Sequence, residues 1–175
     1  MHKHSYECIV RFRRSAVKAR PIAIFACVAT FAGLASAKLS TGERTMLLPT
    51  TLCLAAAAAI INFWLGNRIG RLRQQFKVSI GDGGNELIAR RMRAQLNFAE
   101  NVPLVLILIA AIELAGKGGV WLAPVGAVFM VGRVLHALGM DGGQFAWGRM
   151  AGIAITFLTA IGLAVVAVLV ATGKL

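Results

Sequence analysis

Acidic residues are scarce in this sequence. It contains 7 aspartates and glutamates against 19 lysines and arginines, which gives a formal net charge of +12. A surplus of this size can indicate nucleic-acid binding, but the basic residues beyond the N-terminal segment mostly flank long apolar runs, and no groove-reading motif accompanies them. Anionic lipid head groups attract basic residues at such positions. The charge therefore favours contact with a membrane, and we expect no nucleic-acid partner.

Motifs for metals and nucleotides are also lacking. The three cysteines form no CxxC pair, so neither a disulfide framework nor a zinc site is indicated. His2 and His4 have no further ligand nearby, which makes them a weak metal signal. The glycine-rich stretch 81–84 has no Walker lysine and no strand before it, so it predicts a turn. We expect no metal ion.

What the chain has in abundance is long apolar sequence. Hydrophobic residues make up 58% of it and the mean hydropathy is +0.73, which leaves too little polar surface for a soluble globule. A membrane-spanning helix needs about 20 mostly apolar residues. Four runs of this kind occur, at 46–66, 96–115, 120–140 and 150–172. They are continuous rather than alternating, so we predict an all-α, integral membrane four-helix bundle.

The connections between these runs indicate its topology. Glycine-rich turns at 116–119 and 141–143 are short enough only for hairpins, so the helices that they join are antiparallel neighbours. The link 67–95 is longer and rich in arginine. By the positive-inside rule we expect loop 67–95 to face the cytoplasm.

Residues 1–45 form a basic N-terminal extension ahead of the four-helix domain, 46–175. Three interpretations are open. The first is a signal peptide, with an apolar stretch at 21–34 and a small-residue cleavage site, Ala35-Ser36-Ala37. The second, which we prefer, is that translation begins at Met46 immediately ahead of the first run. The third is a short fifth span that is not cleaved.

A stripe of polar side chains leads into the second apolar run. Arg90, Arg93, Asn97 and Glu100 recur at three- and four-residue spacing, which places them on one helix face. Ionisable groups at the edge of a hydrocarbon span are costly, so they are usually paired or functional. One interpretation is structural, with Arg93 paired to Glu100 or a neighbouring helix and Asn97 in an interhelical hydrogen bond. The other is a ligand site.

Further basic residues favour the ligand site. Arg133 and His136 stand near the end of the third run, and Arg149 opens the fourth, so basic groups from three helices meet at one membrane face. Arginine binds carboxylates in a two-point manner, and Glu100 can accept from an ammonium group. We therefore expect a pocket for a small zwitterionic or anionic ligand, which lipid tails can enter from the side.

Small residues in the spans allow helices to approach closely. They comprise the run from Ala55 to Ala59 and the glycines Gly126, Gly132, Gly152 and Gly162. Such residues can serve either assembly between subunits or packing within one subunit.

At the polar stripe the chain resembles a known family. The segment Arg93-Ala94-Gln95-Leu96-Asn97-Phe98-Ala99-Glu100-Asn101-Val102-Pro103 is similar to the signature of the membrane-associated proteins in eicosanoid and glutathione metabolism, the MAPEG family. The segment 132–139 is similar to its bacterial members, and the resemblance extends over 46–175. It implies a bacterial inner-membrane protein that forms a homotrimer, with glutathione bound at subunit interfaces on the cytoplasmic half.

The resemblance also assigns residues. Those that match glutathione-binding positions on the second helix are Arg93, Gln95, Asn97 and Glu100. Arg149 is the match to the family arginine that faces the thiol, and we expect it to be catalytic. With these we group Arg90, Arg133 and His136 as glutathione-binding candidates. Eicosanoid-making members have tyrosines where this chain has Asn101, His136 and Met140, which argues against leukotriene synthesis.

The resulting expectation is a membrane-bound glutathione transferase or peroxidase. It would activate glutathione as a thiolate that attacks a lipophilic electrophile or reduces a lipid hydroperoxide. The main alternative is a binding protein of the same fold that holds a lipid or glutathione without turnover. A proton-coupled exporter that uses Glu100 as its proton carrier is a third possibility. The surrounding arginines argue against it, because they favour the anionic form of this carboxylate.

Overall fold

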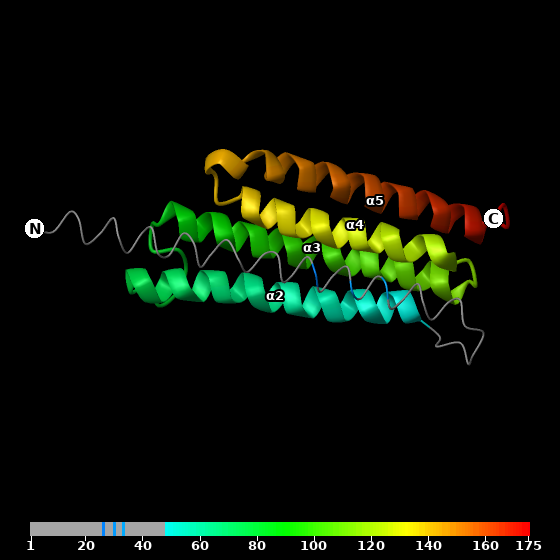
Figure 1. Cartoon of the computed structure of the whole chain (residues 1–175), viewed down its shortest axis with the longest axis horizontal. Coiled ribbons are helices and arrows are strands. Elements are labelled where there is room, and N and C mark those ends of the chain that lie inside the picture. The colour runs from blue at the N-terminus through cyan, green and yellow to red at the C-terminus, as the bar shows by residue number, and fades with distance from the viewer. Residues whose placement is uncertain (1–25, 27–29, 31–32, 34–47) are drawn as a thin grey trace, which may run out of the picture.

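The computed structural model describes residues 48–175 together with Ala26, Thr30 and Gly33. Four long helices lie antiparallel along one axis (Figure 1). They are α2 (Pro49–Phe76), α3 (Glu86–Leu114), α4 (Gly119–Gly139) and α5 (Trp147–Ala171), with a short 3-10 helix, η1 (Gly143–Phe145), before the last. Each is long and apolar enough to cross a membrane, and the described residues include no strand. The predicted all-α membrane bundle is confirmed. The interpretations of 1–45 concern a segment that lies almost wholly outside the described residues.

The first two helices extend well beyond their apolar runs. α2 continues to Phe76, where Lys77 adopts a left-handed conformation with φ 56°, and α3 already begins at Glu86. Asn85 caps α3, because its side chain accepts hydrogen bonds from the backbone N–H groups of Leu87 and Ile88. The prediction that all of 67–95 is a loop is therefore wrong. Residues 67–76 and 86–95 are helical, and only 77–85 is non-helical. Arginine and glutamine are good helix formers, so the helices continue after the hydrophobic signal stops.

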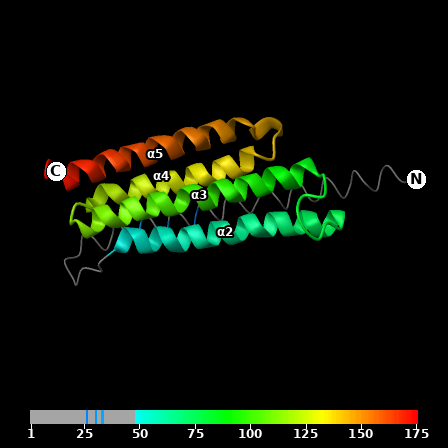
Figure 2. The ribbon, with the colours of Figure 1, turned by 180° about the vertical axis from the view of Figure 1, so that it is seen from behind.

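The bundle is arranged in the order α2, α3, α4 and α5, as both views of the ribbon show (Figures 1 and 2). α5 packs on α4 and α3, while α2 packs on α3 and α4. Fully buried apolar side chains fill the space between the helices, among them Ile61, Ile109, Leu122 and Phe129. Burial of such side chains against one another gives the four helices a single core.

Glycines bring α4 and α5 together. A Cβ atom at Gly152 would lie 2.5 Å from the carbonyl oxygen of Gly132, and one at Gly139 would lie 2.1 Å from the backbone nitrogen of Arg149. No larger residue fits these positions, so the glycines allow the two backbones to touch. The expected close approach is confirmed within one subunit. Gly162 is different, since nothing lies within 4 Å of a Cβ atom there.

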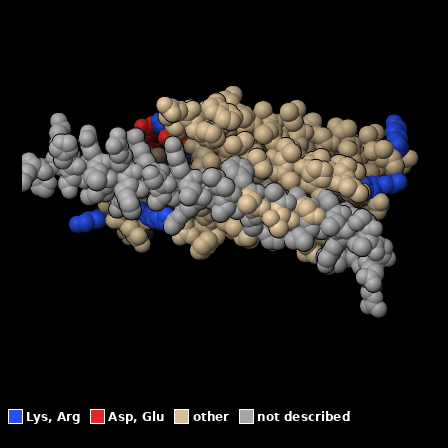
Figure 3. All heavy atoms as spheres, viewed as in Figure 1, with Lys and Arg blue, Asp and Glu red and all other residues tan. Residues whose placement is uncertain are grey.

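Lysines and arginines gather at the two ends of the bundle on one of its faces (Figure 3). On the face drawn in Figure 3, the described lysines and arginines lie towards the two ends, with uncharged surface between them. At the end that holds the α3–α4 turn, the Glu113 carboxylate accepts from the backbone N–H groups of Thr50 and Thr51, both at 2.9 Å. This carboxylate caps the start of α2 from a neighbouring helix. An uncharged belt between polar ends is the pattern expected of a bilayer-spanning bundle.

Candidate functional site

A cavity of about 460 Å³ opens at the end of the bundle where α2 leads into α3. Three helices contribute to it. Its lining consists of Arg93, Leu96, Asn97 and Glu100 from α3, His136 from α4 with Met140 just after it, and Arg149 and Ile153 from α5. Five of these eight residues are candidates from the sequence. The structure therefore brings together most of the polar groups that the sequence singled out.

The α3 wall of the cavity follows directly from helical spacing. Arg93, Asn97 and Glu100 stand at i, i+4 and i+7, so they line one face of α3. Arg93 and Glu100 are exposed and make no ion pair or hydrogen bond among the described residues. The predicted ion pair between Arg93 and Glu100 is therefore absent from the described residues. They are charged groups available to a ligand or to another chain.

Arg133 lies beneath the cavity rather than in its lining. Only 1% of this residue is exposed. Its guanidinium donates from Nη2 to the Asn97 side-chain oxygen at 2.5 Å and from Nη1 to the Thr156 hydroxyl at 2.9 Å. Asn97 is therefore in the interhelical hydrogen bond that the structural interpretation predicted. Arg133 orients Asn97 from below, and its Nε has no partner among the described residues.

His136 lies where α4 and α5 touch. A Cβ atom on Gly152 would be 2.6 Å from the Cβ of His136, so the glycine on α5 makes room for this side chain. His136 is 4% exposed, lines the cavity, and its Nδ1 has no partner among the described residues. A buried polar atom usually has a partner. His136 is thus a buried polar side chain whose Nδ1 finds no hydrogen-bond partner among the described residues.

Arg149 completes the site from the first turn of α5. Its side chain is exposed and has no hydrogen bond or ion pair in the described part of the chain. The cavity therefore presents two free guanidiniums, from Arg93 and Arg149, and one free carboxylate, from Glu100. That set suits a ligand with both negative and positive groups. No cluster of metal-ligating side chains occurs among the described residues.

The connection between α4 and α5 is anchored by a carboxylate that the sequence analysis did not single out. Asp141 accepts from Arg91 at 2.9 and 3.1 Å and also forms an ion pair with Arg68. Arg68 in turn lies 4.7 Å above the ring of Trp64, and Arg91 donates to the Arg68 carbonyl oxygen. Asp141 thereby ties the turn that leads to Arg149 to both α2 and α3.

Two candidates lie outside the cavity lining. Arg90 is on the outer surface and pairs with Glu86 at 2.5 Å. Gln95 turns towards α2, where its side-chain nitrogen donates to Asn62 at 3.3 Å. The structure does not bring either residue together with the other candidates. Their assignment to glutathione binding stays a prediction.

Comparison with known proteins agrees with this architecture. The MAPEG family model matches residues 51–169, which is more than half of the chain and runs from the first turn of α2 to the last turn of α5. The chain belongs to the MAPEG family. The resemblance read from the α3 segment is thus confirmed, and the family places the chain among membrane proteins of glutathione and eicosanoid metabolism.

Curated relatives in Escherichia coli show the same relationship. The Inner membrane protein YecN of strain K12 is 30% identical over 96 residues, which span 54% of this chain and 72% of YecN. The YecN of strain CFT073 matches equally. These names agree with the four membrane-spanning helices, and the expected bacterial inner-membrane location is confirmed.

Proposed function

We propose that this protein is a glutathione-dependent membrane enzyme, a transferase or peroxidase, and that the cavity between α3, α4 and α5 is its glutathione site. The observation that supports this most is the convergence of Arg93, Glu100 and Arg149 in one cavity without partners among the described residues. Glutathione has two carboxylates, one ammonium group and one thiol. Two guanidiniums and a carboxylate match three of those groups in charge.

Each residue then has a separate task. Arg93 binds a glutathione carboxylate, and Glu100 accepts from the ammonium group. Asn97 keeps its side-chain oxygen on Arg133, so its amide nitrogen can donate to the peptide. Arg90 could join the carboxylate only by leaving Glu86.

Arg149 is the residue that we assign to the thiol. A free thiol has a pKa of about 8.5, so only a few per cent is thiolate at neutral pH. A neighbouring cation lowers the pKa of a thiol because it stabilises the anion. In conjugation, the sulfur then forms a bond to the electrophilic carbon, and the leaving group departs with the bonding electrons. His136 lines the same cavity, so its imidazole can pack against the bound ligand.

We also propose that the site is completed by other copies of the chain, in a homotrimer. Glu100 and Arg93 are exposed on a helix that crosses the membrane. Leu96, Leu104 and Ile107 on the same helix are each more than half exposed. Charged groups facing hydrocarbon are costly, and a neighbouring subunit over this face would remove that cost.

Calorimetric titration of glutathione into the detergent-purified protein tests the proposal, with thiolate absorbance measured in the same sample. We expect saturable binding and a thiolate signal near neutral pH. Arg149→Ala should abolish the thiolate signal and lower turnover at least tenfold while glutathione still binds. Arg71→Ala is the matched control, because Arg71 is exposed at the same end of the bundle but does not line the cavity.

The other outcomes are equally informative. Binding without a thiolate signal would favour the alternative, a protein that holds glutathione without turnover. Unchanged turnover in Arg149→Ala would overturn the role of this residue. The absence of glutathione binding would overturn the proposal and favour a structural role for Arg93 and Arg149.

A further inference from the structure

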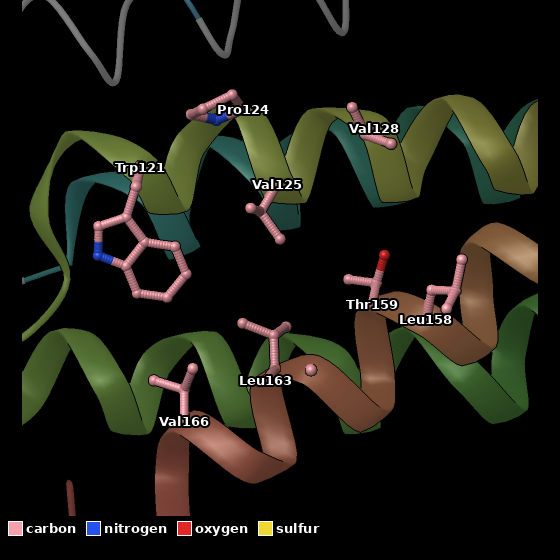
Figure 4. A pocket seen from close by; sticks show the side chains of 9 residues that line it. Trp121, Pro124, Val125, Val128, Leu158, Thr159, Leu163 and Val166 are labelled. Atoms are coloured by element: carbon pink, nitrogen blue, oxygen red, sulfur yellow. The ribbon is translucent and has the colours of Figure 1, made fainter. Parts of the chain in front are cut away.

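A second cavity lies in the other half of the bundle, far from the proposed glutathione site. It occupies about 500 Å³ between α4 and α5 (Figure 4). Its lining comprises Trp121, Pro124, Val125 and Val128 from α4 and Leu158, Thr159, Gly162, Leu163 and Val166 from α5. We call this space the α4–α5 groove. Gly162 is more than three turns beyond Arg149 on α5, about 20 Å at 1.5 Å per residue.

The groove exists because one side chain is missing. Nothing lies within 4 Å of a Cβ atom built on Gly162, whereas Gly132, Gly139 and Gly152 on the same helix pair are in tight contact. In Figure 4 the side chains of Trp121, Val125 and Leu163 project into the space between the two helices. The α4 and α5 backbones therefore touch at the cytoplasm-assigned end and leave an apolar recess at the other end.

The groove runs inward from the edge of the membrane. Trp121 is in the first turn of α4, and Val166 is in the last two turns of α5. From Trp121 to Val128 the groove extends about 10 Å along α4 at 1.5 Å per residue. Tryptophan is enriched at the membrane interface, with its ring at head-group depth. The mouth of the groove is thus at the level of lipid head groups.

Two lysines stand beyond that mouth. Lys117 is in the turn before α4 and Lys174 follows the end of α5, and both are exposed. Glu113, the acidic residue described at this end, is occupied by the start of α2. Long lysine side chains can extend to head-group phosphates. This end is therefore positively charged above an apolar recess.

We propose that the α4–α5 groove is a binding site for an anionic glycerophospholipid. One acyl chain fills the recess over Gly162, and Lys117 and Lys174 contact the phosphate. The site is independent of the proposed glutathione chemistry at the opposite end.

Fluorescence of Trp121 tests this directly. In a Trp64→Phe/Trp147→Phe background, Trp121 is the tryptophan that remains. The full chain is reconstituted in bilayers that contain brominated phosphatidylglycerol or brominated phosphatidylcholine. Bromine quenches only nearby tryptophan, so the relative affinity of the two lipids at the groove can be read from quenching. We expect a severalfold preference for phosphatidylglycerol.

Variants identify the contacts. Gly162→Leu places a side chain in the recess, where a Cβ atom has no neighbour within 4 Å, and should abolish the preference. Lys117→Gln combined with Lys174→Gln should abolish it as well. Ala154→Leu introduces the same leucine side chain at an exposed α5 position outside the groove and should preserve the preference. Equal quenching by both lipids in the parent protein would overturn the proposal, because it indicates ordinary lipid contact. A preference that survives Gly162→Leu would also overturn it. Loss of oligomers in Gly162→Leu would assign the groove to a second copy instead.

Discussion

Arg133 is an arginine buried in a membrane-spanning helix with no acidic partner among the described residues. Its charge is accommodated by two neutral acceptors, the Asn97 side-chain oxygen and the Thr156 hydroxyl. Thr156 also donates to the Gly152 carbonyl oxygen at 2.7 Å, so the network continues into α5. A single polar network therefore connects α3, α4 and α5 directly below the cavity.

Removal of the Thr156 hydroxyl should destabilise this network. Thr156→Val keeps the shape of the side chain but leaves Arg133 Nη1 without an acceptor. We expect a loss of about 1–3 kcal/mol in the free energy of unfolding, since a buried donor would be unsatisfied. Denaturant titration in mixed micelles measures this change in the free energy of unfolding.

Thr172→Val is the control, because the Thr172 hydroxyl is exposed and bonds within its own helix. We expect a change within about 0.5 kcal/mol there. Equal stability of the two variants would show that the hydrogen bond from Arg133 to Thr156 does not stabilise the bundle.

Helical spacing correctly predicted the α3 wall of the cavity, but it did not predict the position of Gln95 or the role of Asp141. Arg93, Asn97 and Glu100 share a face at helical spacing, and all three line the cavity. Gln95 is about 200° around the helix from Arg93 at 100° per residue, and the structure has it against α2. Asp141 had no visible role in the sequence, because its partners are on two helices far from it along the chain.

At the scale of the helices, the α4–α5 contact decides the shape of the site. His136 and Arg149 line one cavity because Gly139, Gly148 and Gly152 let the two backbones approach. Of these three, the sequence analysis had named only Gly152 as a residue that allows close approach; it had not named Gly139 or Gly148. It left open whether such residues pack within one subunit or between subunits, since a glycine looks the same in both cases.

A pair of glycine variants tests this contact. Gly152→Ala should reduce the free energy of unfolding by about 1–3 kcal/mol, because the added methyl overlaps the Gly132 carbonyl and must separate the helices. The same change at Gly162 meets no atoms and should leave stability equal or higher, since alanine favours helix over glycine. Thermal unfolding monitored by circular dichroism compares them. Equal losses in both variants would contradict the assigned packing.

At the scale of the whole molecule, the cavity has an open side on which charged residues of a single chain are exposed. Arg93, Glu100 and Arg149 are exposed on membrane-spanning helices. We expect native mass spectrometry in detergent to give a trimer, because neighbouring subunits would shield these charges from lipid. A monomer that binds glutathione as tightly as the oligomer would contradict the proposal that neighbouring copies of the chain complete the site.

The sequence by itself determined the membrane class, the number of long helices, their antiparallel order and the family. These follow from run length, turn residues and the local α3 segment, all of which are properties of neighbouring residues. Tertiary structure alone decided that Arg133 is buried beneath the cavity, that Asp141 anchors the α4–α5 connection, and that an apolar groove opens over Gly162. Those features depend on which helix faces which, because the partners are distant along the chain and meet only when the bundle packs.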